Sequence, residues 1–124
     1  MIRVGTDIVQ FSRIDAVLER QGLRFVQRIL TPSEQLEFAH SPQGGRLLAK
    51  RFAAKEAVAK ALGTGIGRGV SWQHIEIQHD ERGGPRVRLS GGAREVANSH
   101  GCSAVALSIA DELEYAVAFA VLSP

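Results

Sequence analysis

Two acidic residues stand where their types could support phosphate chemistry. Asp7 lies near the end of an otherwise apolar N-terminal segment, where we expect it on the face that Gly5 leaves open. Glu56 lies about 50 residues further on, in an alanine-rich segment. A carboxylate inside an apolar strand costs free energy unless it is paired with another group or bound to a cation. Two carboxylates provide hard oxygen ligands for Mg²⁺, which keeps water and substrate phosphates for its other positions. Asp7 and Glu56 are therefore candidate metal ligands.

Each carboxylate also has a simpler interpretation. Asp7 could cap a helix or form a salt bridge. Glu56 lies four residues before Lys60, and such a pair on one helix face stabilises the helix by only a few tenths of a kcal/mol. Both alternatives stay open when each residue is judged alone.

The pattern of residues from Gln43 to Leu62 predicts the longest helix of the chain. The charged residues of this helix do not lie on one face. Arg51 and Lys55 fall on one side of a helical wheel, and Glu56 and Lys60 fall on another. A surface helix normally turns its charges towards water, and a helix that is apolar nearly all round is buried. Some of these charges should therefore meet a ligand or another chain.

A glycine-rich segment follows this helix directly. Gly63, Gly65, Gly67 and Gly69 alternate with Thr64, Ile66 and Arg68, a spacing that lets backbone N–H groups turn towards an anion. The segment leaves a helix instead of entering one, and it lacks the Gly-Lys-Ser/Thr of a phosphate-binding P-loop. A plain helix stop is the alternative.

The remaining pattern predicts the elements that must position these residues. Residues 1–9 alternate as a strand does, and Thr31-Pro32-Ser33-Glu34 has the pattern of a helix-capping box. We expect an α+β fold, in which helices pack on one face of an antiparallel sheet. The expected helices are 12–21, 24–30, one from Pro32 that ends at Ser41-Pro42, 43–62 and 93–99; the expected strands are 1–9, 75–77, 86–89, 103–109 and 115–122.

Charge is unevenly distributed along the chain. Residues 1–62 carry ten Lys/Arg against six Asp/Glu, whereas residues 63–124 carry five against seven. The arginines near the N-terminus favour an acidic partner or a polyphosphate ligand; a solvated helix face is the alternative. A single Trp, a single Tyr and the lack of a basic tail argue against nucleic acid.

Length and composition limit the class of protein. The 124 residues are enough for one domain, 1–124, and 44% hydrophobic with 23% charged residues is ordinary for a globular fold. The longest apolar stretch has eight residues, against about 20 for a membrane span, and no signal-peptide pattern precedes it. One cysteine excludes an internal disulfide. A cytosolic protein that contacts no membrane is expected.

Two blocks follow each other along the chain: Gly5-Thr6-Asp7-Ile8-Val9 with Arg13-Ile14, and Arg51-Phe52-Ala53-Ala54-Lys55-Glu56-Ala57 with Lys60-Ala61-x-Gly63-Thr64-Gly65. Two further segments are Arg28-Ile29-Leu30-Thr31 and Tyr115-Ala116-x-Ala118. In these segments the chain resembles holo-[acyl-carrier-protein] synthase, the short single-domain branch of the 4′-phosphopantetheinyl transferases, and the resemblance extends over the full chain. One departure is Ala110-Asp111-Glu112, where many relatives carry a histidine, so a role of that histidine does not transfer to this chain.

The resemblance implies a reaction and its partners. The enzyme would move the phosphopantetheine arm of coenzyme A to a serine of apo acyl carrier protein, with Mg²⁺ as cofactor and adenosine 3′,5′-bisphosphate as the other product. This reaction would support fatty acid biosynthesis. The family's active form is a homotrimer with sites between subunits.

The resemblance also assigns roles to residues of this chain. Asp7 and Glu56 would hold Mg²⁺, and Glu56, directly or through a water, would take the serine proton. Lys60 would stabilise the pyrophosphate as part of the catalytic set. The segment Gly63, Thr64, Gly65, Ile66, Gly67 would hold a phosphate or the adenosine end. Arg13, Arg20 and Arg24 would meet the acidic carrier protein.

Two other functions stay open at this point. A Mg²⁺-dependent pyrophosphate hydrolase acting on coenzyme A or a nucleotide would use the same carboxylates, with water as the nucleophile. A non-catalytic module would bind acidic proteins through the N-terminal arginines and form no product.

Overall fold

The computed structural model describes residues 1–124 and contains helices and strands close to the predicted ones. Most boundaries differ from the expected ones by one or two residues. The order is β1 (Arg3–Gln10), α1 (Phe11–Gln21), α2 (Leu23–Ile29), α3 (Pro32–His40), α4 (Gly44–Leu62), the short 3₁₀ helix η1 (Trp72–His74), β2 (Ile75–His79), β3 (Pro85–Leu89), α5 (Gly91–Ser99), β4 (Ala104–Asp111) and β5 (Tyr115–Ser123).

Local signals fix where the helices begin and end. The capping box at α3 is confirmed, because the Thr31 side chain accepts from the Glu34 backbone and the Glu34 side chain accepts from the Thr31 backbone. Gly63 ends α4 in the left-handed conformation, with φ 86°, which glycine adopts without a steric penalty. Gly63 therefore determines where α4 ends and in which direction the chain continues.

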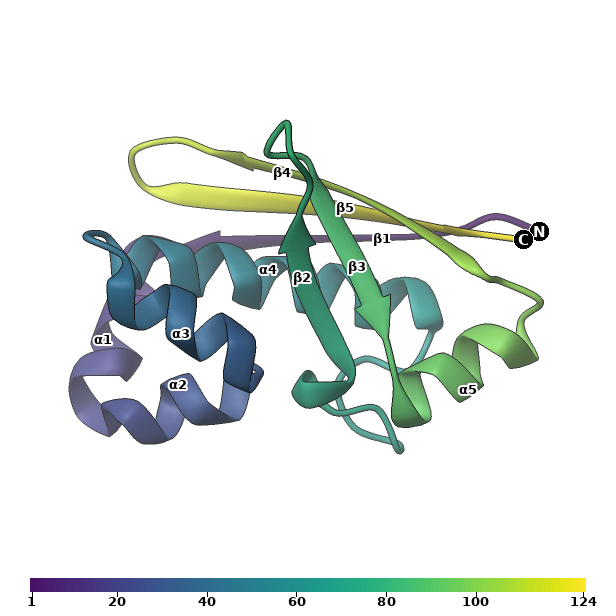
Figure 1. Cartoon of the computed structure of the whole chain (residues 1–124), viewed down its shortest axis with the longest axis horizontal. Helices are drawn as coiled ribbons and strands as arrows, with labels where there is room; N and C mark the ends of the chain where they lie inside the picture. Colours follow the sequence, from purple (N-terminus) through teal and green to yellow (C-terminus); the bar gives the residue numbers. More distant parts are fainter.

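The strands form two antiparallel sheets. β1, β5 and β4 lie side by side in that order, and the hairpin β2–β3 forms a separate two-stranded sheet. Figure 1 shows the hairpin crossing the three-stranded sheet and α4. The α+β class with antiparallel strands is confirmed.

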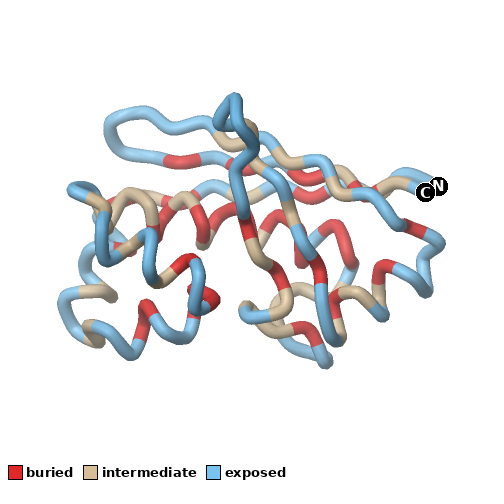
Figure 2. Tube along the Cα trace, viewed as in Figure 1, coloured by how far each residue is buried: buried red, intermediate tan, exposed pale blue.

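Helix α4 packs along the inner face of the three-stranded sheet (Figure 1). The strand residues beneath it are small: Gly5 pairs with Ala120, and Val9 with Ala116, and all four are buried. Buried alanines of α4 face them. Because both surfaces lack bulk, helix and sheet approach closely, and the buried residues in Figure 2 line this contact.

The other face of this sheet is apolar and exposed. Val4 and Ile8 of β1 are 57% and 60% exposed, and Phe119 of β5 is 45% exposed. The alternation predicted for residues 1–9 is present, but its more apolar side faces outward. None of the helices is both long and apolar enough to span a bilayer.

Candidate active site

Gly5 brings β1 against α4 and so brings Asp7 to Glu56 and Lys60. A Cβ at Gly5 would lie 2.0 Å from the Ala57 carbonyl oxygen, a distance that no side chain tolerates. Asp7 was expected to lie on a face that Gly5 leaves open. That interpretation was wrong, because α4 fills the space and the missing side chain serves close packing instead.

Asp7 forms an ion pair with Lys60. The Lys60 ammonium lies 3.0 Å from the Asp7 carboxylate and 3.1 Å from the Thr6 carbonyl oxygen. The salt-bridge alternative for Asp7 is thus realised, whereas the Glu56–Lys60 pair is not among the ion pairs. The Lys60 side chain is 51% exposed and that of Asp7 16%. An exposed lysine holds its partner weakly and stays free to turn towards a phosphate.

Glu56 is a half-buried carboxylate without an ion pair or hydrogen bond in the chain. Burial raises its pKa, the neighbouring Asp7 carboxylate raises it further, and Lys60 opposes both. The effect of Asp7 on Glu56 means that the two charges lie within electrostatic reach. Two carboxylates that disfavour each other's charge are a pair that a cation stabilises.

No group of three or more His, Cys, Asp or Glu side chains is arranged to hold a metal ion. Asp7 and Glu56 would therefore be the two carboxylate ligands that the chain supplies. That number suits Mg²⁺, which commonly takes one or two carboxylates and completes its octahedron with water and substrate phosphates.

The glycine-rich segment after α4 is only partly available to an anion. The backbone N–H groups of Gly63, Gly65 and Gly67 donate to Lys60, Ala59 and Val70 of the same chain. The spacing predicted that successive backbone N–H groups of this segment turn towards an anion, and these three are instead engaged within the chain. The N–H groups of Thr64 and Ile66 donate to no backbone carbonyl, so these two amides remain for a ligand.

Two side chains for which the sequence predicted no role fix the end of α4. Arg3 donates to the carbonyl oxygens of Ala61 at 2.8 Å and Leu62 at 3.5 Å, and the His100 ring nitrogen lies 2.9 Å from the Leu62 oxygen. These contacts satisfy carbonyls that a helix end leaves free and so position the start of the glycine-rich segment.

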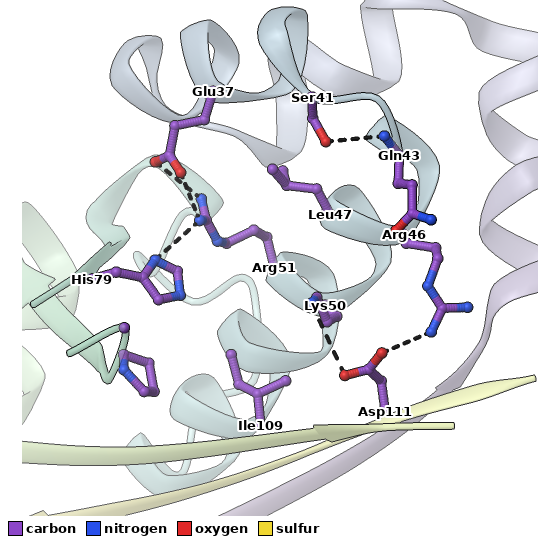
Figure 3. Close-up of a pocket in the computed structure, with 12 residues that line it drawn as sticks. Glu37, Ser41, Gln43, Arg46, Leu47, Lys50, Arg51, His79, Ile109 and Asp111 are labelled. Atoms are coloured by element: carbon purple, nitrogen blue, oxygen red, sulfur yellow. Dashed lines mark hydrogen bonds and ion pairs between the residues drawn. The ribbon is translucent and has the colours of Figure 1, made fainter. Parts of the chain in front are cut away.

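A basic cavity of about 410 Å³ lies at the other end of α4, between that helix, the hairpin and β4. Figure 3 shows Arg46, Lys50 and Arg51 of α4 pointing into it, with Asp111 of β4 below. Neither Asp7 nor Glu56 lines it. A signal existed in the sequence, since residues 44–55 carry four Lys/Arg and no Asp/Glu, but the opposite wall comes from distant segments.

Asp111 holds two cations of this cavity in place. It lies 2.7 Å from Arg46 and 4.0 Å from Lys50. Arg46 also donates to the Glu112 carbonyl and stacks over the Phe11 ring, 4.0 Å from its centroid. Asp111 thus has a structural role in this chain.

Arg51 and His79 form the opposite wall (Figure 3). The Arg51 guanidinium lies 3.1 Å from Glu37 and 3.4 Å from the His79 Nδ1 atom. Burial and then the Arg51 charge lower the pKa of His79. A neutral imidazole is therefore favoured at this wall.

A second cavity, of about 250 Å³, lies beside α1. Arg13, Arg20 and Arg28 line it together with apolar side chains such as Phe25 and Phe52. Two of the three arginines expected to meet a partner therefore flank an apolar hollow. Arg24 is exposed but does not line this cavity.

The expectation that the scattered charges of α4 meet a ligand or another chain needs a correction at two positions. Lys55 is fully buried and lies 2.6 Å from Glu34. Arg51 is 4% exposed and lies near Glu34 and Glu37. Burial lowers the pKa of Lys55, and Glu34 opposes that effect. Sequence spacing did not reveal these partners because they come from a different helix, α3.

Comparison with known proteins identifies the class. A family model described as the 4′-phosphopantetheinyl transferase superfamily matches residues 3–120. A holo-[acyl-carrier-protein] synthase of Shewanella amazonensis is 61% identical over 122 residues, covering 98% of both chains. The chain therefore belongs to the 4′-phosphopantetheinyl transferase superfamily, an enzyme family.

Solved structures are similar over the whole chain. The synthase from Neisseria meningitidis superposes with a TM-score of 0.93, at 44% identity and full coverage of both chains. The Helicobacter pylori synthase, solved in complex with coenzyme A, has a TM-score of 0.84 at 32% identity, covering 97% of this chain and 99% of that one. The resemblance to the short holo-[acyl-carrier-protein] synthases is confirmed.

Proposed function

We propose that the chain transfers the 4′-phosphopantetheine group of coenzyme A to a serine of apo acyl carrier protein and releases adenosine 3′,5′-bisphosphate, with Mg²⁺ as cofactor. The observation that carries the proposal is the meeting of Asp7, Glu56 and Lys60 on β1 and α4. The names of the relatives support the same reaction. The acceptor would be the carrier protein of fatty acid biosynthesis, and the cytosolic location stays a prediction.

Asp7 and Glu56 are the residues that would hold Mg²⁺. Two neighbouring carboxylates, of which Glu56 has a pKa raised by burial and by Asp7 and has no cation partner in the chain, fit a divalent ion. When bound, Mg²⁺ would neutralise charge on the pyrophosphate and help align the reacting groups.

Glu56 is the candidate base for the serine proton. Its raised pKa makes its carboxylate a better proton acceptor than an ordinary surface glutamate. Asp7, paired with Lys60, would act as a metal ligand only. Lys60 would exchange this pair for the pyrophosphate oxygens, since its ammonium is half exposed.

The basic cavity is the site that fits the phosphorylated nucleoside end of coenzyme A. Its volume suits a ligand of this size, and Arg46 and Lys50, which are partly exposed, would provide positive charge for a 3′-phosphate. The glycine-rich segment, through the Thr64 and Ile66 amides, would take an oxygen of the pyrophosphate.

We infer that three copies of the chain assemble around the exposed face of the three-stranded sheet. Exposed apolar side chains of β1 and β5, Val4, Ile8 and Phe119 among them, form the kind of surface that association buries. The carboxylates and the basic cavity lie in different places on one chain. Sites shared between copies would bring them together.

The carrier protein would dock beside α1. Arg13 and Arg20 surround an apolar hollow, which suits an acidic partner that also presents apolar side chains. Such charges mainly raise the rate of encounter and make it sensitive to salt.

Mass spectrometry tests the reaction. Apo carrier protein incubated with coenzyme A, Mg²⁺ and the enzyme should gain the mass of one phosphopantetheine arm, and a chelator should prevent the gain. Release of free phosphopantetheine without a carrier protein would favour the hydrolase, for which the relatives give no support. Binding of the carrier protein without any product would favour the non-catalytic module.

A further inference from the structure

The Lys55 ammonium joins four elements in the interior. Lys55 lies in the middle of α4 with no exposed surface. Its Nζ atom donates to the Glu34 carboxylate at 2.6 Å, to the Ile29 carbonyl at the end of α2 at 2.6 Å, and to the Trp72 carbonyl in η1 at 3.2 Å. A lysine ammonium has three donors, and all of them are used.

Glu34 completes this connection from the side of α3. One of its oxygens accepts from the Thr31 backbone N–H at 2.8 Å, and the other accepts from the Ile77 N–H of β2 at 2.8 Å. The Arg51 guanidinium lies 3.8 Å away. Lys55 and Glu34 together therefore attach α4 to α2, α3, η1 and β2; we call them the Lys55–Glu34 clamp.

On its opposite side, α4 packs against β1 at nearly the same position along the helix axis. Gly5 of β1 contacts the backbone of Ala57 and Ala61. Glu56 lies between Lys55 and Ala57 in sequence, so the clamp on one side and β1 on the other restrict rotation and sliding of the helix at Glu56. A ligand carboxylate needs such support because metal coordination tolerates little displacement.

We propose that Lys55 is a positioning residue of the transferase site, which through its contacts with Glu34, Ile29 and Trp72 fixes Glu56 relative to Asp7. The proposal rests on the function proposed above. Lys55 itself is no phosphate ligand, because it has no exposed surface and no free donor.

A double variant separates positioning from stability. Lys55→Met alone would leave the Glu34 carboxylate buried without a cation, which destabilises the fold. Lys55→Met combined with Glu34→Gln removes both charges, and the amide oxygen of the glutamine still accepts from one of the two backbone donors, Thr31 or Ile77. We expect this double variant to fold, to need at least tenfold more Mg²⁺ for half-maximal transfer, and to lose at least tenfold in kcat. Its KM for carrier protein should stay within twofold, because neither substitution replaces a residue that lines the cavity beside α1.

Leu89→Ala is the matched control. Leu89 is a buried residue of β3 that contributes to stability and not to the clamp. At temperatures where both proteins are fully folded, Leu89→Ala should keep the Mg²⁺ dependence and kcat of the wild type. The same losses in Leu89→Ala, or normal Mg²⁺ dependence and kcat in the folded double variant, would overturn the proposal.

A measurement on the wild type covers the case in which the variants do not fold. The Lys55 ammonium protons, held by three acceptors in the interior, should give a resolved NMR signal. In the wild type this signal should shift when Mg²⁺ is added, and in Glu56→Gln the addition of Mg²⁺ should not shift it. A wild-type protein that binds Mg²⁺ with no shift would contradict the proposal. A shift without any transfer of phosphopantetheine would instead refute the proposed reaction and leave the positioning role intact.

Discussion

At the scale of single residues, the site depends on how each carboxylate is surrounded. Asp7 and Glu56 have the same charge and lie close together, but only Asp7 has a cation partner in the chain. On the proposed function, this difference would give them different roles, with Asp7 as a metal ligand and Glu56 as a ligand or base. No helical wheel reveals it, because Lys60 prefers a residue of β1 to its neighbour on α4.

Glu56→Gln should abolish transfer without weakening the fold. The change keeps the shape of the side chain and removes a half-buried charge that has no cation partner, so the charge contributes nothing favourable to folding. We expect a loss of at least about 100-fold in kcat and a melting temperature equal to or above that of the wild type. Transfer assays in Mg²⁺ and thermal unfolding measure the two effects. A near-normal rate would refute the role of Glu56.

Charge reversal at Arg13 should weaken the binding of carrier protein and leave the binding of coenzyme A unchanged. Arg13 lines the cavity beside α1, whereas Arg24 is exposed outside it. Arg13→Glu should raise the KM for carrier protein about tenfold or more at low salt. Arg24→Glu is the matched comparison and should have a smaller effect. Equal changes in the KM of both substrates would mean that Arg13 belongs to another surface.

At the scale of elements, close packing of α4 on β1 is what assembles the site. Gly5→Ala would place a methyl group against the Ala57 carbonyl and the Ala61 nitrogen. Helix and strand must then separate, which we expect to cost about 3 kcal/mol of unfolding free energy and to lower transfer in the protein that stays folded. Denaturant unfolding measures the cost.

Gly101→Ala serves as the control for the loss of a glycine. Gly101 has φ 70°, and a Cβ added there would meet no other atom within 4 Å, so only backbone strain of about 1 kcal/mol is expected. If Gly5→Ala is no more destabilising than Gly101→Ala, the close approach of β1 and α4 is not the reason for the glycine.

The contact between α3 and β2 predicts that the stability of the fold depends on pH in the acidic range. Hydrogen bonds donated by Thr31 and, more weakly, by Ser33 lower the pKa of Glu76, although partial burial opposes them. A carboxyl whose pKa is lower in the folded than in the unfolded state stabilises the fold above its unfolded pKa and loses that contribution as the pH falls.

Glu76→Gln should therefore be less stable than the wild type near neutral pH and lose less stability in acid. Melting temperatures of both proteins between about pH 7 and pH 3 should converge towards the acid end. Parallel curves would show that Glu76 is not the group concerned.

Local patterns predicted the elements well, and long-range contacts escaped them. The capping box at Thr31, the end of α4 at Gly63 and the alternation in β1 each depend on residues that are neighbours in the sequence. By contrast, the role of Gly5 and the pairing of Lys55 with Glu34 depend on which segments meet in the fold. The basic cavity was not predicted for the same reason, since Asp111 and His79 come from strands that are far from α4 in the sequence. The residue types alone made Asp7 and Glu56 candidate metal ligands, and the resemblance assigned both to one site.

At the scale of the whole molecule, one chain carries the carboxylates and the basic cavity in different places, with an apolar sheet face left exposed. Two defective variants should therefore complement each other. Glu56→Gln lacks the base, and a double variant, Arg46→Gln with Lys50→Gln, lacks two cations of the cavity. Each alone should be nearly inactive. If a site combines the carboxylates of one copy with the cavity of its neighbour, mixed trimers contain some complete sites.

The size of the recovered activity decides between the two arrangements. In randomly mixed trimers at a ratio of one to one, a shared site has an intact Glu56 in about half of cases and an intact neighbouring cavity in about half, so about a quarter of wild-type activity should return. A site within one chain would always contain one defect and recover nothing. Phe119→Asp, which places a charge on the exposed sheet face, should prevent both assembly and recovery; recovery among monomers would contradict assembly through that face.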